Sequence, residues 1–310
     1  MLDLLPSPIA VVAHDSGAVN HIIAWSKNVD RKKMRVCLAG PALQLWESSF
    51  PRTSISTLTD ALSDAKSLLS GTGWASNLEH DARILARKLG IKSVAVVDHW
   101  TNYRNRFIRN GEEVLPDEIW VVDDHAQKLA ETEFPGTHIV QLPNLYLDGL
   151  VKEVQSKEVG LTRSAESHVL YVLEPIRQVW GGDNQPGELQ ALDFFVKQMG
   201  LLRLGDNPSI KLRLHPSETT GKYDKWLEAQ KGLTVTLDNS LNLAESIAWS
   251  NVVVGCQTYA MVIALAAGKR VISSIPPWAP PCVLPQPEII KLTDLLPQTF
   301  PAGKVTSSNN

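Results

Sequence analysis

The chain has 310 residues and a formal net charge of −3, and its hydrophobic fraction of 44% is enough for two ordinary domain cores. A near-neutral chain without a basic run argues against nucleic-acid binding. Three widely spaced cysteines fit neither a disulfide framework nor a zinc site, so we expect a reducing compartment, no metal and no other cofactor. The N-terminus lacks the positive leading region of a signal peptide, and we expect a cytoplasmic protein.

In the first half, short apolar runs alternate with helix-like stretches. Runs that read as strands open the segments 8–17, 35–40, 67–73, 92–100 and 118–125, and helical patterns occupy 18–28, 41–49, 76–90 and 126–134. Apolar runs without polar alternation, separated by helices, are typical of a parallel sheet covered on both faces. This half therefore reads as a Rossmann-like α/β domain.

The pattern restarts after a polar stretch. We interpret residues 156–167 as a linker between an N-terminal domain, 1–155, and a C-terminal domain, 168–310. Neither half contains GxGxxG or GxxxxGK[ST], which disfavours a dehydrogenase and a P-loop NTPase. The predicted fold class is α/β, with two Rossmann-like domains facing across a cleft, the layout called GT-B in glycosyltransferases. Ligands of such sheets bind beyond the carboxyl ends of the strands.

A histidine and a proline follow the predicted strand within residues 209–216, in the segment LRLHPSE. Pro216 fixes its own φ and stops strand pairing, which holds His215 at the rim of the sheet. A histidine can give a hydrogen bond or a proton to a departing phosphate near neutral pH. The simpler alternative is a histidine that ends a strand before an ordinary turn.

LRLHPSE resembles the HP motif of bacterial sialyltransferases, some Kdo transferases and teichoic-acid glycerophosphotransferases. The resemblance implies a CMP- or CDP-activated donor bound by the C-terminal domain, with His215 stabilising the leaving phosphate and Pro216 and Ser217 beside the donor. It also implies a phosphate-binding motif at a later helix start, where Gly255, Gln257 and Thr258 stand in place of paired serines. Plain capping of that helix explains the same residues.

Glu174 follows the predicted strand within 168–175, where it is a candidate for binding a ribose or sugar hydroxyl or for the chemistry itself. A solvated loop glutamate is the alternative. Gly182 lies in a glycine-rich turn that can wrap a nucleotide.

The N-terminal domain is expected to bind the acceptor substrate. Asp15 follows the first strand and resembles, loosely, the acidic motif whose carboxylate is the catalytic base in sialyltransferases. Further candidate acceptor-binding residues combine aromatic faces with hydroxyl-reading groups; they are His14, Ser16, Trp74, Asp98, His99, Trp100, Asn102, Tyr103 and Arg106. Turn residues and a protein interface are the alternatives.

The sequence thus predicts a metal-independent glycosyltransferase of bacterial surface-polysaccharide synthesis, using a CMP-activated nonulosonic or Kdo-type sugar and a glycan or glycolipid acceptor. The alternatives are a UDP-sugar transferase, a non-hydrolysing UDP-sugar 2-epimerase, or a sugar- or nucleotide-binding protein without catalysis. The Pro-rich segment 275–287 is compatible with a lid, a peripheral contact at the inner membrane face, or a chain crossing.

Overall fold

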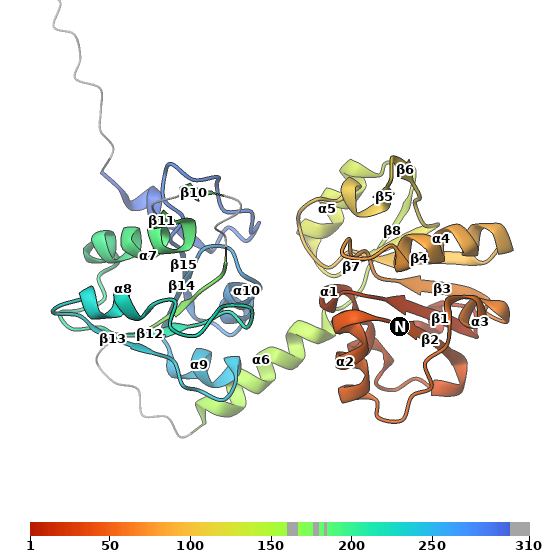
Figure 1. The fold of residues 1–310 in the computed structure, drawn as a ribbon, viewed down its shortest axis with the longest axis horizontal. Coiled ribbons are helices and arrows are strands. Elements are labelled where there is room, and N and C mark those ends of the chain that lie inside the picture. Colours follow the sequence, from red (N-terminus) through yellow and green to blue (C-terminus); the bar gives the residue numbers. More distant parts are fainter. Residues whose placement is uncertain (160–166, 176–179, 183–184, 298–310) are drawn as a thin grey trace, which may run out of the picture. The chain divides into compact units, whose positions relative to one another are not determined.

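The computed structural model describes residues 1–159, 167–175, 180–182 and 185–297, and the chain divides into two compact units. The first unit, here called the N-domain, spans Met1–Gly149, and the second, the C-domain, spans Leu150–Asn310. In Figure 1 each unit is a sheet with helices packed on it.

The N-domain sheet has the strand order β2-β1-β3-β4-β7-β8, and every pairing in it is parallel. Its strands are β1 (Ile9–Ala13), β2 (Met34–Leu38), β3 (Ser67–Ser70), β4 (Lys92–Val96), β7 (Glu118–Val121) and β8 (His138–Gln141), and β5 (Ile108–Arg109) pairs with β6 (Glu112–Glu113) in an antiparallel hairpin. The helices are α1 (Ser16–Ser26), α2 (Gly40–Ser49), α3 (Leu58–Ser63), α4 (Leu78–Leu89) and α5 (Asp124–Glu133), with short 3-10 turns η1 (Leu2–Leu4), η2 (Arg31–Lys33) and η3 (Arg104–Phe107).

Strand β1 shows why its residues form a central strand. All five of its residues are buried. Ile9, Val11 and Ala13 belong to one core cluster, whereas Ala10 and Val12 belong to another. Because side chains alternate across a sheet, an unbroken apolar strand supplies both cores at once.

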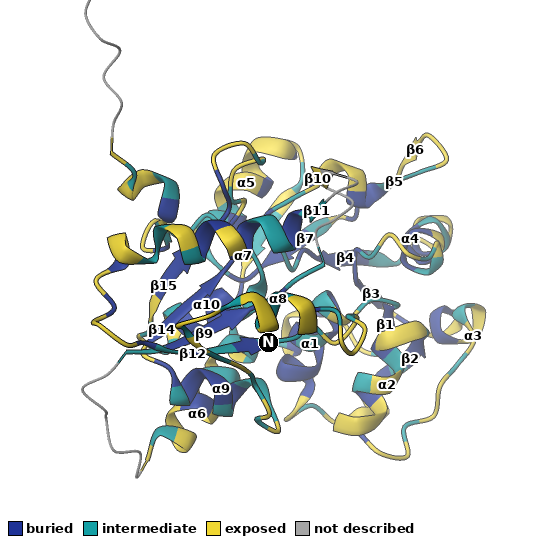
Figure 2. Cartoon of the chain, turned by 60° about the vertical axis from the view of Figure 1, so that its left-hand side comes forward, coloured by how far each residue is buried: buried dark blue, intermediate teal, exposed yellow. Residues whose placement is uncertain are grey.

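Within the described residues, the C-domain sheet has the order β13-β12-β9-β14-β15-β16, again with parallel pairings. Its strands are β9 (His168–Val172), β12 (Ser209–Arg213), β13 (Thr234–Leu237), β14 (Val252–Gly255), β15 (Arg270–Ser273) and β16 (Ile290–Lys291), and β10 (Gly181–Gly182) pairs with β11 (Gln185–Pro186). The helices are α7 (Gly187–Gln198), α8 (Asp224–Ala229), α9 (Leu243–Trp249) and α10 (Tyr259–Ala266), with 3-10 turns η4 (Met199–Leu202) and η5 (Leu292–Leu295). Figure 2 shows β14, and β9 beyond its first residue, in the dark blue of buried residues.

The predicted fold class, two Rossmann-like α/β domains, is confirmed. Helix α6 (Leu145–Glu158) was not predicted from the sequence, because Val154 is its one buried residue and no apolar stripe marks it. The first residues of the predicted linker, 156–158, are the end of α6, and residues 160–166 lie outside the described part. No helix in the described part is both long and apolar enough to cross a membrane.

Candidate functional site

Three predicted site residues gather at one edge of the C-domain sheet. Strand β9 lies between β12 and β14, and all three run parallel. Their carboxyl ends therefore point to the same edge, where Glu174, His215 and Gln257 follow them. The Gln257 backbone N–H donates to Oε2 of Glu174 over 3.3 Å, which ties the first of these residues to the third.

The ring of His215 is oriented by its own turn. Its Nδ1 accepts the backbone N–H of Ser217 at 3.2 Å and lies 2.8 Å from the Ser217 hydroxyl oxygen. Because Nδ1 is an acceptor in this arrangement, the neutral imidazole carries its proton on Nε2. Pro216, between the two residues, keeps this turn in one shape. The histidine therefore presents an N–H donor on the side away from its own turn.

A buried ionic cluster supports the backbone of His215. Its N–H donates to Oε2 of Glu218 over 3.0 Å, and Oε1 of Glu218 accepts from Lys222 at 2.8 Å and from the Tyr223 hydroxyl at 2.5 Å. Lys222 also pairs with Glu188, whose side chain is 1% exposed. Burial works to raise the pKa of Glu218, but the bonds from Lys222, Tyr223 and the His215 N–H outweigh it and lower that pKa. Glu218 is thus an ionised support.

Sequence reasoning did not single out this cluster. The available signal was the i, i+4 pair Glu218 and Lys222 directly behind the HP pair. Glu188 comes from the first turn of α7, 34 positions away from Lys222, and only the fold brings it there.

The pKa of Glu174 is shifted in the opposite direction from that of Glu218. Burial raises the pKa of its carboxyl to about 7, the bond from the Gln257 N–H opposes this, and the charge of Glu218 adds to the rise. Near neutral pH this residue therefore exchanges a proton readily, which suits either hydrogen bonding to a sugar hydroxyl or proton transfer.

The other predicted donor-binding residues occupy ordinary structural positions at this edge. A Cβ on Gly255 would lie 2.8 Å from a methyl of Val172, so packing alone demands glycine there. Thr258 is the N-cap of α10, and its hydroxyl lies 3.5 Å from the Ala260 N–H. Gly182 pairs with Gln185 in the β10–β11 hairpin. These contacts fix the backbone but leave the ligand roles of the residues as predictions.

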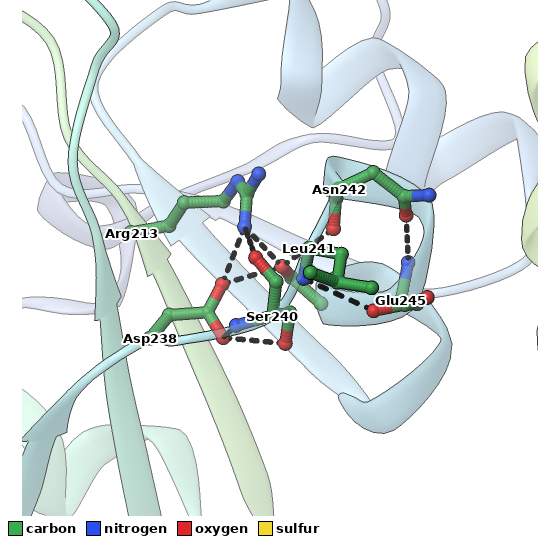
Figure 3. Close-up of polar contacts among 7 residues, drawn as sticks. Arg213, Asp238, Ser240, Leu241, Asn242 and Glu245 are labelled. Atoms are coloured by element: carbon green, nitrogen blue, oxygen red, sulfur yellow. Dashed lines mark hydrogen bonds and ion pairs between the residues drawn. The ribbon is translucent and has the colours of Figure 1, made fainter.

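An ion pair between Arg213, the last residue of β12, and Asp238, the residue after β13, anchors the loop that follows β13 (Figure 3). Arg213 donates to Asp238 and to the Ser246 hydroxyl, each over 2.7 Å, and Ser246 also bonds to Asp238. The side chain of Asp238 is fully buried. Because Asp238 already neutralises Arg213, this guanidinium is a poor candidate for a phosphate ligand.

The N-domain holds a second candidate site, a cavity of about 340 Å³ at the carboxyl ends of β1, β3 and β4, here called the N-domain pocket. Of the predicted acceptor-side residues, five line it, namely Asp15, Ser16, Trp74, Asp98 and Arg106. Its other lining residues are Gly17, Ala18, Pro41, Thr72, Gly73 and Glu79. Carboxylates outnumber basic groups in this lining, which favours a hydroxyl-rich ligand over an anion.

One wall of the N-domain pocket is a buried ion pair. Arg106 donates from Nη1 to Asp98 at 2.8 Å and to the Thr72 hydroxyl at 3.1 Å, and its Nε donates to the Thr101 carbonyl at 3.2 Å. The guanidinium also lies 5.7 Å from the ring centre of Trp74, an indole that is 54% exposed. This wall therefore combines a fixed charge pair with an aromatic face that a sugar can cover.

Two carboxyl groups of the lining, those of Asp15 and Glu79, both bond to His14. Its ring Nδ1 lies 2.6 Å from Oδ1 of Asp15, and its backbone N–H donates to Oε1 of Glu79 over 2.8 Å. Glu79, in the first turn of α4, is 1% exposed, and its Oε2 has no hydrogen-bond partner within the described part of the chain. The sequence shows a glutamate here but not its burial.

The remaining predicted residues are not among the lining of this pocket in the described structure. Trp100 is buried and donates its indole N–H to both oxygens of Asp123 at 3.0–3.1 Å, and Tyr103 donates to the Ala126 carbonyl at 3.2 Å. His99 lies 3.3 Å from the Thr101 hydroxyl, and burial lowers its pKa. Asn102 has a positive φ of 59°. These residues shape the segment that carries Arg106.

Among the described residues, no group of three or more His, Cys, Asp or Glu is arranged to hold a metal ion. No protein-family model matches the chain, and no curated protein matches it. Solved structures, in contrast, resemble the chain in fold.

Three such structures illustrate the likeness. UDP-GlcNAc 2-epimerase from Neisseria meningitidis, bound to UDP-GlcNAc, has a TM-score of 0.55 and 12% identity, covering 86% of this chain and 82% of its own. The S. aureus MnaA–UDP complex has a TM-score of 0.56 and 10% identity, covering 86% and 79%. The glycotransferase of kitacinnamycin has a TM-score of 0.53 and 15% identity, covering 94% and 84%. The similarity extends over both domains, and the chain has the GT-B fold.

Proposed function

We propose that this protein is a glycosyltransferase that uses a nucleotide-activated sugar, with UDP as the favoured nucleotide. The observation that carries the proposal is the convergence of Glu174, His215 and Gln257 at one edge of the C-domain sheet. Two similar structures hold UDP or UDP-GlcNAc, which supports UDP over the CMP donor that the HP pair predicts. A CMP-sugar remains the second choice of donor.

In the proposed reaction, the bond between the sugar and the nucleotide phosphate breaks as an acceptor oxygen bonds to the sugar carbon. His215 donates its Nε2–H to the phosphate oxygen on which negative charge develops. The N–H groups at the start of α10 and the Thr258 hydroxyl hold the phosphate. Asp15 in the N-domain pocket receives the proton of the acceptor hydroxyl. Glu174 binds a hydroxyl of the ribose or of the transferred sugar.

The second candidate function is a UDP-sugar 2-epimerase. It is favoured by the carboxylates Asp15 and Glu79, joined through His14, since an epimerisation needs proton acceptors and donors but no acceptor substrate. Three of the similar structures are described as UDP-GlcNAc 2-epimerases, one of them provisionally.

The test is a nucleotide titration followed by product analysis. UDP at 100 times its Kd should raise the stability of the full chain by about 2.7 kcal/mol, and CMP should do so much less. Incubation with UDP-GlcNAc alone, followed by NMR, detects epimerisation, and addition of sugar acceptors detects transfer. Stabilisation by CMP alone would favour the CMP-sugar reading. Binding of neither nucleotide, with intact UDP-GlcNAc and CMP-sugar after long incubation, would refute the proposal.

A further inference from the structure

The N-domain pocket contains a buried carboxyl group, that of Glu79, whose surroundings do not stabilise a negative charge. Glu79 is 1% exposed, and it lines the pocket. Its Oε1 accepts the His14 backbone N–H, whereas Oε2 has no partner among the residues that the structure describes. A buried charge without full hydrogen bonding is costly, so such a group keeps its proton.

The charged groups around Glu79 come from three directions. Asp15, on the β1–α1 loop, adds a negative charge that disfavours a second one, and the Asp98–Arg106 pair in the same pocket is neutral overall. Arg83, one turn further along α4, is the nearby cation, but it donates to the carbonyls of Gly71 and Val114. Burial, the largest influence, and the charge of Asp15 raise the pKa of Glu79 against the opposing effects of the His14 N–H, the residue's own backbone N–H and Arg83.

We propose that Glu79 is a neutral carboxylic acid at neutral pH and that it donates a hydrogen bond from Oε2–H to an oxygen atom of a ligand in the N-domain pocket. The proton resides on Oε2 because Oε1 already accepts the His14 N–H. The pocket then selects ligands that present an acceptor oxygen, such as a sugar hydroxyl or ring oxygen, at this point. That this ligand is the glycosyl acceptor rests on the proposed function; the protonation state does not.

Asp15 and Glu79 have different environments, and we therefore assign them different roles in proton transfer and hydrogen bonding. Asp15 bonds to the His14 ring at the mouth of the pocket, while Glu79 is enclosed. Two carboxyl groups with contrasting environments commonly provide one base and one acid. Asp15, which bonds to the His14 ring, is then the candidate base and Glu79 the acid.

The experiment labels glutamate side chains with ¹³C at Cδ and follows their NMR signals from pH 4 to pH 9. Glu174→Gln serves as the background, because Glu174 also titrates late. In this background we expect one signal that titrates above the ordinary glutamate range, disappears when Glu79→Gln is added, and persists when Glu47→Gln, a change at an exposed site, is added instead. If the Glu79→Gln variant does not fold, a late-titrating glutamate signal in the Glu174→Gln protein itself is the result that supports the proposal. Ordinary titration of every glutamate in that background would overturn the proposal.

The ligand contact is tested by kinetics of sugar transfer from UDP-GlcNAc. Glu79→Ala, which removes the donor, should raise the acceptor KM about tenfold, the value of a hydrogen bond to a buried group. Glu79→Gln, whose amide N–H can replace the O–H, should raise it clearly less. Equal losses in the two variants would overturn the donor role. If no transfer exists at all, the proposed function fails while the NMR titration still decides the protonation state.

Discussion

A side chain at position 17 would collide with the carboxylate of Asp98, because a Cβ built on Gly17 lies 1.7 Å from Asp98 Oδ2. Gly17 is the second residue of α1, where alanine would ordinarily be the better helix former. The close packing of Asp98 against α1 therefore requires glycine at this position, although the helix itself would favour another residue. It allows Asp98 to lie against the start of α1 while Arg106 holds it from the other side.

The first prediction concerns this contact. Gly17→Ala should destabilise the protein by about 1–3 kcal/mol, the usual cost of overpacking, and should displace Asp98 and Arg106. Urea unfolding measures the first effect, and the acceptor KM measures the second. Gly149→Ala is the matched control, since nothing lies within 4 Å of its Cβ position in helix α6, and it should be neutral or stabilising. A stable Gly17→Ala variant with a normal acceptor KM would contradict the assignment.

The second prediction concerns the ionic cluster behind His215. Lys222→Met keeps the apolar stem but leaves Glu188 and Glu218, both at most 1% exposed, without their cation. We expect a loss of about 3–5 kcal/mol in unfolding free energy at pH 7. The loss should shrink toward pH 4, because the unpaired carboxylates can then take up protons.

Lys157→Met is the control for this change, since it removes an exposed partner of Glu245. An exposed pair contributes at most about 1 kcal/mol, so this variant should unfold nearly as the wild type does. Equal effects of the two substitutions would show that the Lys222 cluster is not a buried charge network.

The two-domain fold was predictable because β1, β9 and β14 are continuous apolar runs, a pattern that a parallel sheet produces and few other structures share. Asp15 and Glu174, which follow β1 and β9, could be named for the same reason, whereas His215 follows the alternating strand β12 and could be named only from its pairing with Pro216. The environments of these side chains could not be predicted. The burial of Glu79 and the pairing of Glu188 with Lys222 depend on contacts between segments that only the folded chain brings together.

Composition was a weaker guide in the segment 98–106. A dense mixture of aromatic and polar residues predicts a carbohydrate surface, and Asp98 and Arg106 do line the N-domain pocket. Trp100 and Tyr103 instead satisfy their polar atoms inside the domain, on Asp123 and Ala126. An indole N–H needs a partner whether it lies in a core or in a sugar site, so the residue type alone does not separate the two.

The third prediction uses the pKa of Glu174, which burial raises to about 7 from an ordinary 4.5. Between these values the folded state binds more protons than the unfolded state, so stability falls as the pH rises through this window. Glu174→Gln should lose this slope. The difference in unfolding free energy between wild type and variant should change by up to about 3 kcal/mol from pH 4 to pH 8, measured by urea titration. A difference that stays constant over this range would contradict the raised pKa.

The fourth prediction separates the ring of His215 from its support. His215→Ala should lower kcat by roughly 10²–10⁴ while the nucleotide still binds, because the donor to the leaving phosphate is lost. Ser217→Ala removes a hydroxyl but keeps the backbone N–H that bonds to Nδ1, so the loss in kcat should be much smaller. Steady-state rates with saturating UDP-sugar measure both variants. Near-normal turnover by His215→Ala would exclude a catalytic role.

The last prediction concerns Asp15 as the base. Its Oδ1 bonds to the His14 ring, which orients the carboxylate, and its Oδ2 lies 2.1 Å from where a Cβ on Gly73 would be. Asparagine fits the same space but cannot accept a proton at neutral pH. Asp15→Asn should therefore fold and bind UDP normally, yet transfer sugar at least about 100-fold more slowly. Glu174→Gln, made in parallel, distinguishes the two domains: if it alone abolishes transfer while UDP still binds, the proton acceptor is Glu174 and the role proposed for Asp15 is wrong.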